Sequence, residues 1–128
     1  MKKSSRPLSP HLQIYRPQLT SVMSTLHRIS GGFLMLSSLL LVGWLLALAS
    51  GPLWLDCYQS VFKHVLGRLT LIAISASYFY HLYNGIRHLM WDTGRGLDLT
   101  SVYQSGYLVL IATSASTAFL WMLILNIE

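Results

Sequence analysis

Three long stretches without a charged residue constrain this chain more than any other feature. Residues 29–55, 69–86 and 99–127 contain no Asp, Glu, Lys or Arg. A helix needs about 20 apolar residues to cross the ~30 Å hydrocarbon core of a bilayer. The first and third stretches exceed that length, and the second reaches it if Arg87 extends from the helix end to the interface. The sequence therefore predicts an all-α integral membrane protein with three transmembrane helices.

Composition leaves no room for a separate soluble domain, because 53% of the 128 residues are hydrophobic and only 10% are charged. We expect a single membrane domain, residues 1–128, with helices at about residues 21–49, 68–91 and 101–127. An extended N-terminal segment, residues 1–20, precedes them, since its three prolines oppose helix formation. No secretory signal is expected, because the first apolar run begins only after residue 28.

The positive charges predict the orientation of the chain in the membrane. Seven of the nine Lys and Arg residues fall on the side shared by the N-terminus and the second loop: Lys2, Lys3, Arg6, Arg16, Arg28, Arg87 and Arg95. The positive-inside rule then places the N-terminus inside and the C-terminus outside. The cations are not gathered on a folded basic face, so no nucleic-acid partner is expected.

The apolar surface of the helices and the single cysteine indicate which partners and which cysteine chemistry to expect. Three helices bury little of so apolar a surface, so we expect a heteromeric helix bundle with an obligate membrane partner. Cys57 is the only cysteine, which excludes an internal disulfide and the Cys-x-x-Cys-His motif of covalent haem attachment. It is interpreted as a loop residue without a special role.

His81 lies inside the second apolar stretch. Ionisable groups within a spanning helix are costly and by default mark a site, and imidazole is a common ligand of haem iron. Taken alone, His81 is explained equally well by a hydrogen bond to a neighbouring helix. Ser77 and Gly85 flank it at i−4 and i+4, and their small side chains leave a shallow face that a flat macrocycle could approach.

Several polar residues should meet at the inner ends of the first two helices, about 10 Å above His81 at ~1.5 Å rise per residue. A b-type haem needs an axial imidazole within the bilayer, which His81 can supply, and cations for its two propionates. The candidates for that second role are His27, Arg28, Arg87 and His88. A quinone needs a hydroxyl and a cation at the interface, and Ser24 and Arg28 suit that role. Individually, the arginines could be snorkelling anchors and the histidines interfacial residues; their convergence favours a site.

The histidine spacing bears on how an iron would be held. His81 and His88 project from one helix two turns apart, so they cannot clamp opposite sides of one iron. His27 is expected to lie too near the surface to face His81. A six-coordinate haem would therefore need its second ligand from another chain.

Three segments of the chain resemble the cytochrome b556 subunits of succinate dehydrogenase, the respiratory complex II. Arg6 to Tyr15 is similar to the N-terminal signature of that family, and Ser24 to Gly31 is similar to its Ser-x-x-His-Arg-x-[Ser/Thr]-Gly motif. His81 to Asp92 is similar to its His-x3-Gly-Ile-Arg-His motif. The resemblance covers nearly the whole chain and includes the number and order of the spans.

The resemblance implies a membrane-anchor subunit without dehydrogenase chemistry of its own. His81 would be an axial ligand of haem b, shared with a histidine of a second membrane-anchor subunit. Ser24 and Arg28 would line a ubiquinone site beside the iron–sulfur subunit, with a flavoprotein subunit beyond it, and His27 and Arg28 would contact the haem propionates. The location would be a bacterial inner membrane, or the mitochondrial one if the chain is organelle-encoded. Two alternatives stay open: a structural anchor without haem, and an anchor of a quinol:fumarate reductase.

Overall fold

A computed structural model of the chain describes residues 15–127, which form four helices and the short segments between them. These are α1 (Leu19–Ser50), α2 (Pro52–Lys63), α3 (Val65–Asp92) and α4 (Leu99–Ile127). α1, α3 and α4 are long and apolar enough to cross a membrane. They begin two or three residues earlier than the sequence suggested. Most of the expected extended segment, and of the signature from Arg6 to Tyr15, falls outside the described residues.

The start of α1 is set by Ser21, which lies one turn inside the helix. The backbone N–H of Gln18 donates to the Ser21 hydroxyl oxygen at 3.2 Å, and that hydroxyl donates to the Gln18 carbonyl at 2.9 Å. The Tyr15 hydroxyl also donates to it at 2.6 Å. These bonds satisfy groups that a helix end would otherwise leave unpaired, so the helix begins at Leu19.

α2 was not expected, because residues 52–63 were interpreted as a loop. Gly51, with φ of +106°, ends α1, and Pro52 occupies the first position of α2, where its missing N–H costs nothing. The less exposed side chains of α2 recur at helical spacing, as in an amphipathic helix: Leu55, Tyr58 and Phe62. Cys57 therefore lies in a helix rather than in a loop, and it is exposed.

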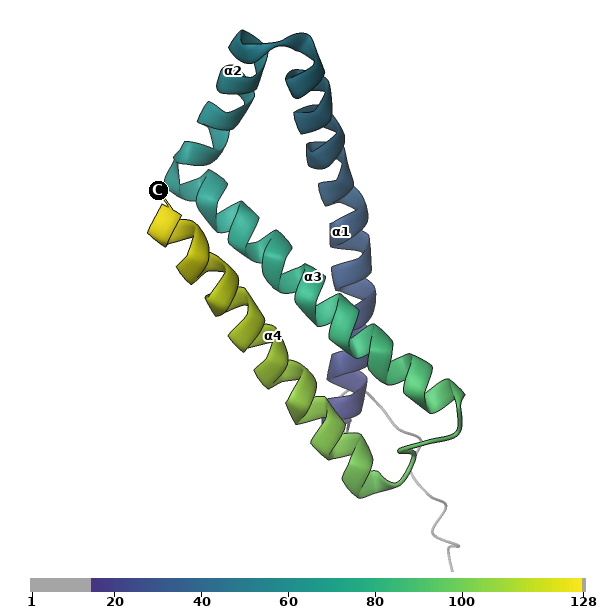
Figure 1. Cartoon of the computed structure of the whole chain (residues 1–128). Coiled ribbons are helices and arrows are strands. Elements are labelled where there is room, and N and C mark those ends of the chain that lie inside the picture. The colour runs from purple at the N-terminus through teal and green to yellow at the C-terminus, as the bar shows by residue number, and fades with distance from the viewer. Residues whose placement is uncertain (1–14, 128) are drawn as a thin grey trace, which may run out of the picture.

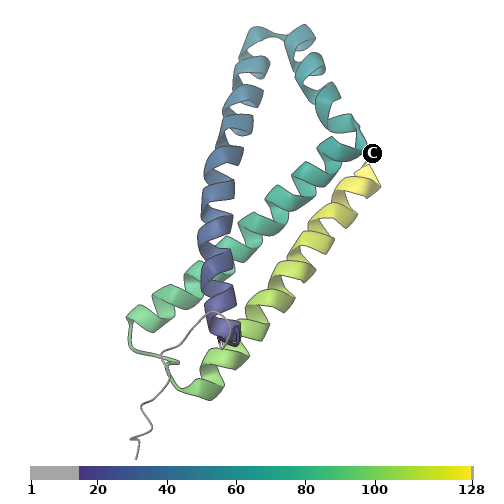
Figure 2. The same cartoon turned by 180° about the vertical axis from the view of Figure 1, so that it is seen from behind.

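The helices form an open frame rather than a closed bundle (Figure 1). α3 and α4 run side by side, while α1 crosses them near one end and then diverges from α3 (Figures 1 and 2). α2 bridges the resulting gap. We call the end with the start of α1 and the α3–α4 loop, residues 93–98, the crossing end, and the opposite end the α2 end.

The buried residues of the described chain gather in the half of each long helix nearer the crossing end: Met23, Ser30, Tyr80, Asn84, Arg87, Gly106 and Val109. Met23, 1% exposed, lies at the centre of the crossing. The Tyr80 hydroxyl donates to its carbonyl at 2.8 Å, and a Cβ on Gly106 would approach its sulfur to 3.0 Å. Only 6% of each span's most apolar window is buried within the chain, so most of the apolar surface is left for lipid or another subunit.

Most hydroxyl groups along the spans are satisfied within their own helix. Ser37 donates to the Phe33 carbonyl at 2.8 Å, Ser75 to Leu71 at 2.8 Å, and Thr117 to Thr113 at 2.8 Å. Such bonds are expected where no water is available to pair with a polar group. A hydroxyl that departs from this pattern is therefore a candidate for a specific role.

Candidate functional site

His81 faces α1 at the level where α1 and α3 cross. Its ring stacks on that of His27 with a centroid separation of 4.0 Å and an interplanar angle of 5°. The expectation that His27 lies too near the surface to face His81 is therefore wrong. That expectation counted residues from the helix ends, and depth along one helix does not fix which residues meet when two helices cross obliquely.

The Nδ1 atom of His81 is held by two groups of α1. It lies 3.1 Å from the Ser30 hydroxyl oxygen and 3.2 Å from the His27 carbonyl oxygen. A carbonyl only accepts, and the Ser30 hydroxyl already donates to that same carbonyl at 2.8 Å. Both contacts are satisfied when Nδ1 carries the proton. Nε2 is then left with its lone pair, and it makes no hydrogen bond within residues 15–127.

Gly31 makes room for the His81 ring on α1. A Cβ at this position would lie 3.0 Å from Cε1 of His81 and 3.5 Å from its Nδ1. At the neighbouring Gly32, a Cβ would meet nothing within 4 Å. A Cβ at the first of the two glycines would therefore crowd the His81 ring, whereas one at the second would meet no neighbour. On α3, a Cβ at Gly85 would lie 3.9 Å from Cε1 of His27, which is an ordinary van der Waals contact.

His88 joins the two stacked rings to form a cluster of three imidazoles. Its ring centroid is 5.2 Å from that of His27, and its edge meets Trp91 at 5.1 Å. The fully buried Asn84 approaches the His88 Nε2 atom with its side-chain nitrogen at 3.4 Å. The Nδ1 atom of His27 is enclosed and has no hydrogen-bond partner among the described residues.

Arg87 does not join this cluster, so its expected role toward a haem propionate is not supported. It is 4% exposed and points toward α4, donating to the Val102 carbonyl at 2.8 Å and the Ser105 hydroxyl at 2.9 Å. It also donates to the Asn84 side-chain oxygen at 3.3 Å and lies 4.0 Å from the Trp91 ring centroid. Arg87 is six residues after His81, so at about 100° per residue it points to a different side of α3, toward α4.

Ser24 and Arg28 lie one turn apart on α1, next to the crossing. Ser24 is half-buried and Arg28 is exposed. Within residues 15–127, neither side chain makes a hydrogen bond or an ion pair. Ser24 thus differs from most hydroxyls of the spans, and this hydroxyl and guanidinium are available together to a ligand.

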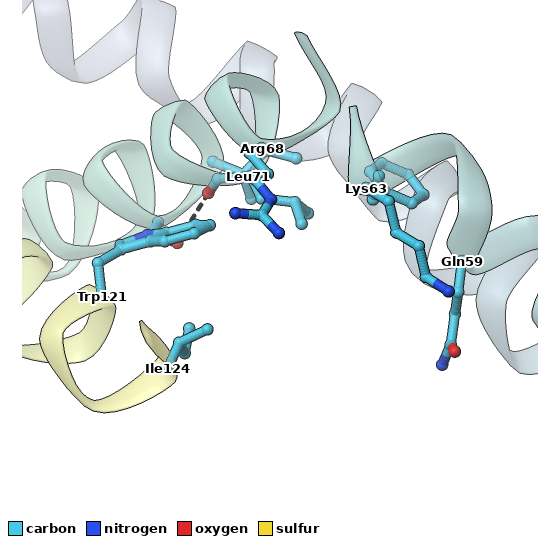
Figure 3. A pocket seen from close by; sticks show the side chains of 9 residues that line it. Gln59, Lys63, Arg68, Leu71, Trp121 and Ile124 are labelled. Atoms are coloured by element: carbon cyan, nitrogen blue, oxygen red, sulfur yellow. Dashed lines mark hydrogen bonds between the residues drawn. The ribbon is translucent and has the colours of Figure 1, made fainter. Parts of the chain in front are cut away.

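One hollow in the surface lies at the α2 end, and another lies between α1 and α3 near the middle of the molecule. A cavity of about 400 Å³ lies at the α2 end, with Lys63, Arg68 and Trp121 in its lining (Figure 3). None of its lining residues is a histidine. A groove of about 320 Å³ lies between α1 and α3 and is lined by Ser30 and Ser77, among others. The second hollow, and not the first, adjoins the histidine cluster.

Comparison with known proteins places the chain in a family. A family model described as "Succinate dehydrogenase/Fumarate reductase transmembrane subunit" matches residues 2–120. The chain belongs to this family. It is 37% identical over 119 residues to the succinate dehydrogenase cytochrome b556 subunit of Rickettsia conorii, with 93% of each chain covered.

Other relatives in the family extend the similarity to a second bacterial lineage and a plant. The cytochrome b556 subunit of Paracoccus denitrificans is 36% identical, covering 97% of this chain and 95% of its own. The cytochrome b560 subunit of Marchantia polymorpha is 41% identical, covering 88% and 85%. The predictions of an all-α transmembrane fold and of this family are confirmed. The spanning helices make the chain a multi-pass membrane protein.

Sequence reasoning found the histidines of this family member but missed residues that hold them. Ser30 and Gly31 belong to the quoted motif, yet neither had been given a role toward His81. The available signal was their spacing from His27, since residues three and four positions on share its helical face. Asn84 and Ser105 gave no comparable signal, because the contacts of Arg87 depend on how α4 packs.

Proposed function

We propose that this chain is a membrane-anchoring cytochrome b subunit of a succinate:quinone oxidoreductase, with His81 as one axial ligand of haem b. The observation that carries the proposal is the environment of His81. Its Nδ1 is engaged by the His27 carbonyl and Ser30, which leaves the Nε2 lone pair for a metal. Metal-bound histidines characteristically use their second nitrogen in this way. When bound, haem b supplies a one-electron carrier inside the membrane.

The surroundings of His81 fit such a group in two respects. Gly31 keeps space at the His81 ring that a Cβ would fill. His27 and His88 lie beside His81 on the side of the crossing end, and the enclosed Nδ1 of His27 lacks a partner among the described residues. We assign His27, Arg28 and His88 to the propionate side, where an imidazole N–H or a guanidinium would pair with a carboxylate.

The second axial ligand is proposed to come from another membrane-anchor subunit. The rings of His27 and His81 lie face to face at 4.0 Å with an interplanar angle of 5°, so their nitrogens do not point at a common atom and the two side chains would not hold one iron together. Stacking geometry, rather than membrane depth, is thus the reason to look to a partner.

Ser24 and Arg28 are proposed to bind the quinone. Reduction of a quinone places negative charge on its carbonyl oxygens before protons arrive. Arg28 would stabilise that charge, and the Ser24 hydroxyl would donate a hydrogen bond to the same region. Their lack of other partners within residues 15–127 supports this role.

The assembly follows from this function. We infer an iron–sulfur subunit and a flavoprotein subunit on the side of the crossing end, since electrons from succinate must reach the quinone that Ser24 and Arg28 are proposed to bind. The positive charges of the sequence support an N-terminus on the inner side of a bacterial inner membrane, or of the mitochondrial one if the chain is organelle-encoded.

The central test is a reduced-minus-oxidised spectrum of the purified complex. We expect a b-type haem band that is lost in His81→Ala. The matched control is His64→Ala, because His64 is exposed at the N-terminus of α3. A complex without the band would be a structural anchor instead, and an unchanged band in His81→Ala would refute the ligand assignment.

The family description also covers fumarate reductases, so the direction of the reaction needs a separate assay. Turnover with a ubiquinone as the electron acceptor supports the succinate dehydrogenase assignment. Efficient fumarate reduction with a low-potential quinol, and poor activity with ubiquinone, would favour the alternative assignment.

A further inference from the structure

We propose that Ser30 is a positioning residue for the haem ligand, acting through Nδ1 of His81. Its hydroxyl, together with the His27 carbonyl, would fix the tautomer and the orientation of the His81 ring. This inference rests on the proposed function, in which His81 binds the iron through Nε2.

Ser30 has a hydroxyl that, besides bonding within α1, also contacts a side chain of another helix. It is 6% exposed, and its oxygen lies 3.1 Å from Nδ1 of His81, a residue on another helix. It also donates to the His27 carbonyl at 2.8 Å, three residues earlier. By contrast, Ser37 is seven residues further along the helix and donates to the Phe33 carbonyl within α1. The cross-helix contact is what distinguishes Ser30.

The protons around His81 can be assigned from these contacts. The hydrogen of Ser30 goes to the His27 carbonyl, so the Ser30 oxygen keeps lone pairs free to accept from Nδ1–H. The carbonyl, 3.2 Å away, accepts from the same N–H. If Nδ1 were unprotonated, it would face the carbonyl lone pairs without a hydrogen between them. The arrangement therefore favours the tautomer with a free Nε2.

This arrangement has consequences for a bound metal. An imidazole whose N–H donates to an acceptor becomes a stronger electron donor through its other nitrogen. A stronger donor stabilises the ferric more than the ferrous state and so lowers the midpoint potential. Loss of such a supporting partner typically weakens metal binding or activity by about 10–100-fold. Because the His27 carbonyl remains in a Ser30 variant, we expect the lower part of that range.

The test uses the assembled complex and compares Ser30→Ala with Ser30→Thr and Ser37→Ala. We expect Ser30→Ala to raise the haem midpoint potential and to lose haem about 10-fold more readily to a haem-binding acceptor protein. Ser30→Thr keeps the hydroxyl and should restore both values. Ser37→Ala removes a hydroxyl from the same helix and should change neither. A Ser30→Ala complex with the wild-type potential and wild-type haem retention would overturn the proposal.

Two further outcomes keep the proposal separable from folding defects and from the proposed function. If Ser30→Ala does not assemble, Ser30→Cys keeps nearly the same shape with a much weaker hydrogen-bonding group. It should shift the potential upward, and an unshifted potential would overturn the proposal. If His81→Ala keeps the haem, the proposed function fails. If His81→Ala loses the haem while Ser30→Ala matches the wild type, only the role of Ser30 fails.

Discussion

The two ends of the molecule are held together in different ways. At the crossing end, α1, α3 and α4 meet around buried polar residues, among them Ser30, Asn84 and Arg87. At the α2 end, α1 and α3 diverge, and α2 is tied back to α1 by the Tyr58 hydroxyl, which donates to the Leu40 carbonyl at 2.6 Å. The Tyr58 ring lies against Gly43, whose would-be Cβ is 3.1 Å away.

The crossing end therefore holds its helices together at several points, whereas the helices of the α2 end stand apart. Within a bilayer, apolar side chains gain little by leaving lipid for one another, so polar contacts and close packing decide where helices join. The crossing end uses several such contacts to fix His81, His27 and His88. The α2 end has few of them, the bond from the Tyr58 hydroxyl to the Leu40 carbonyl being one. The crossing end therefore holds its side chains in a defined arrangement, whereas the α2 end is more open.

Substitution of Arg87 should have the largest effect on the interhelical contacts of the crossing end. We expect Arg87→Met to lower the free energy of unfolding by about 2 kcal/mol. The variant loses two hydrogen bonds to α4, at Val102 and Ser105, and such bonds between membrane helices average roughly 0.6 kcal/mol each. It also leaves the side-chain oxygen of the buried Asn84, in α3 itself, without its Arg87 partner, which adds about 1 kcal/mol. The measurement is the denaturation midpoint of the purified complex in detergent, followed together with the haem absorbance.

Tyr58→Phe is the counterpart of that variant at the α2 end. It removes one hydroxyl and keeps the ring, so we expect a loss of roughly 0.6 kcal/mol and an unchanged haem spectrum. Equal destabilisation by the two variants, or a spectral change in Tyr58→Phe, would contradict the proposed division of the molecule.

The adjacent glycines of α1 give a sharper probe within the crossing end. Gly31→Ala would push the new Cβ to 3.0 Å from the His81 ring, so we expect a displaced ring and a loss of about 1 kcal/mol. Gly32→Ala meets open space and should be neutral or slightly stabilising, since alanine favours helix. The haem absorbance and the electron paramagnetic resonance spectrum of the oxidised complex would report the difference.

The number and class of the spans could be predicted because they follow from local composition. Uncharged stretches must be helical in a bilayer, whatever their neighbours. The histidines could be identified for a related reason, since a polar group in such a stretch is conspicuous in the sequence itself. α2 escaped prediction because its 12 residues are short and mixed in polarity, and only its packing against α1 reveals it.

The contacts of the site could not be predicted because they depend on how helices cross. The stacking of His27 on His81 and the turn of Arg87 toward α4 are properties of pairs of helices. A helical wheel assigns each residue to a face, but it does not say which neighbour covers that face or at what height. Gly31 and Gly32 show this most clearly. They are identical and adjacent in the sequence, yet Gly31 faces the His81 ring and Gly32 faces open space.

The smallest expected effect lies in the loop of the crossing end, at the start of α4. One carboxylate oxygen of Asp98 accepts from the Ser101 backbone N–H at 2.9 Å, which caps the helix and lowers the pKa of Asp98 below its ordinary value. The charged form is thus favoured by folding, so this contribution is present above the pKa of the unfolded chain and is lost as pH falls through the lower folded value.

Asp98→Asn keeps a capping oxygen without the titration, whereas Asp98→Ala removes the cap. Thermal unfolding of the complex from pH 7 down to about pH 3 should show a small acid-dependent loss that is absent in Asp98→Asn, and Asp98→Ala should be less stable at neutral pH. An identical pH dependence in the wild type and in Asp98→Asn would show that the cap contributes nothing measurable to the crossing end.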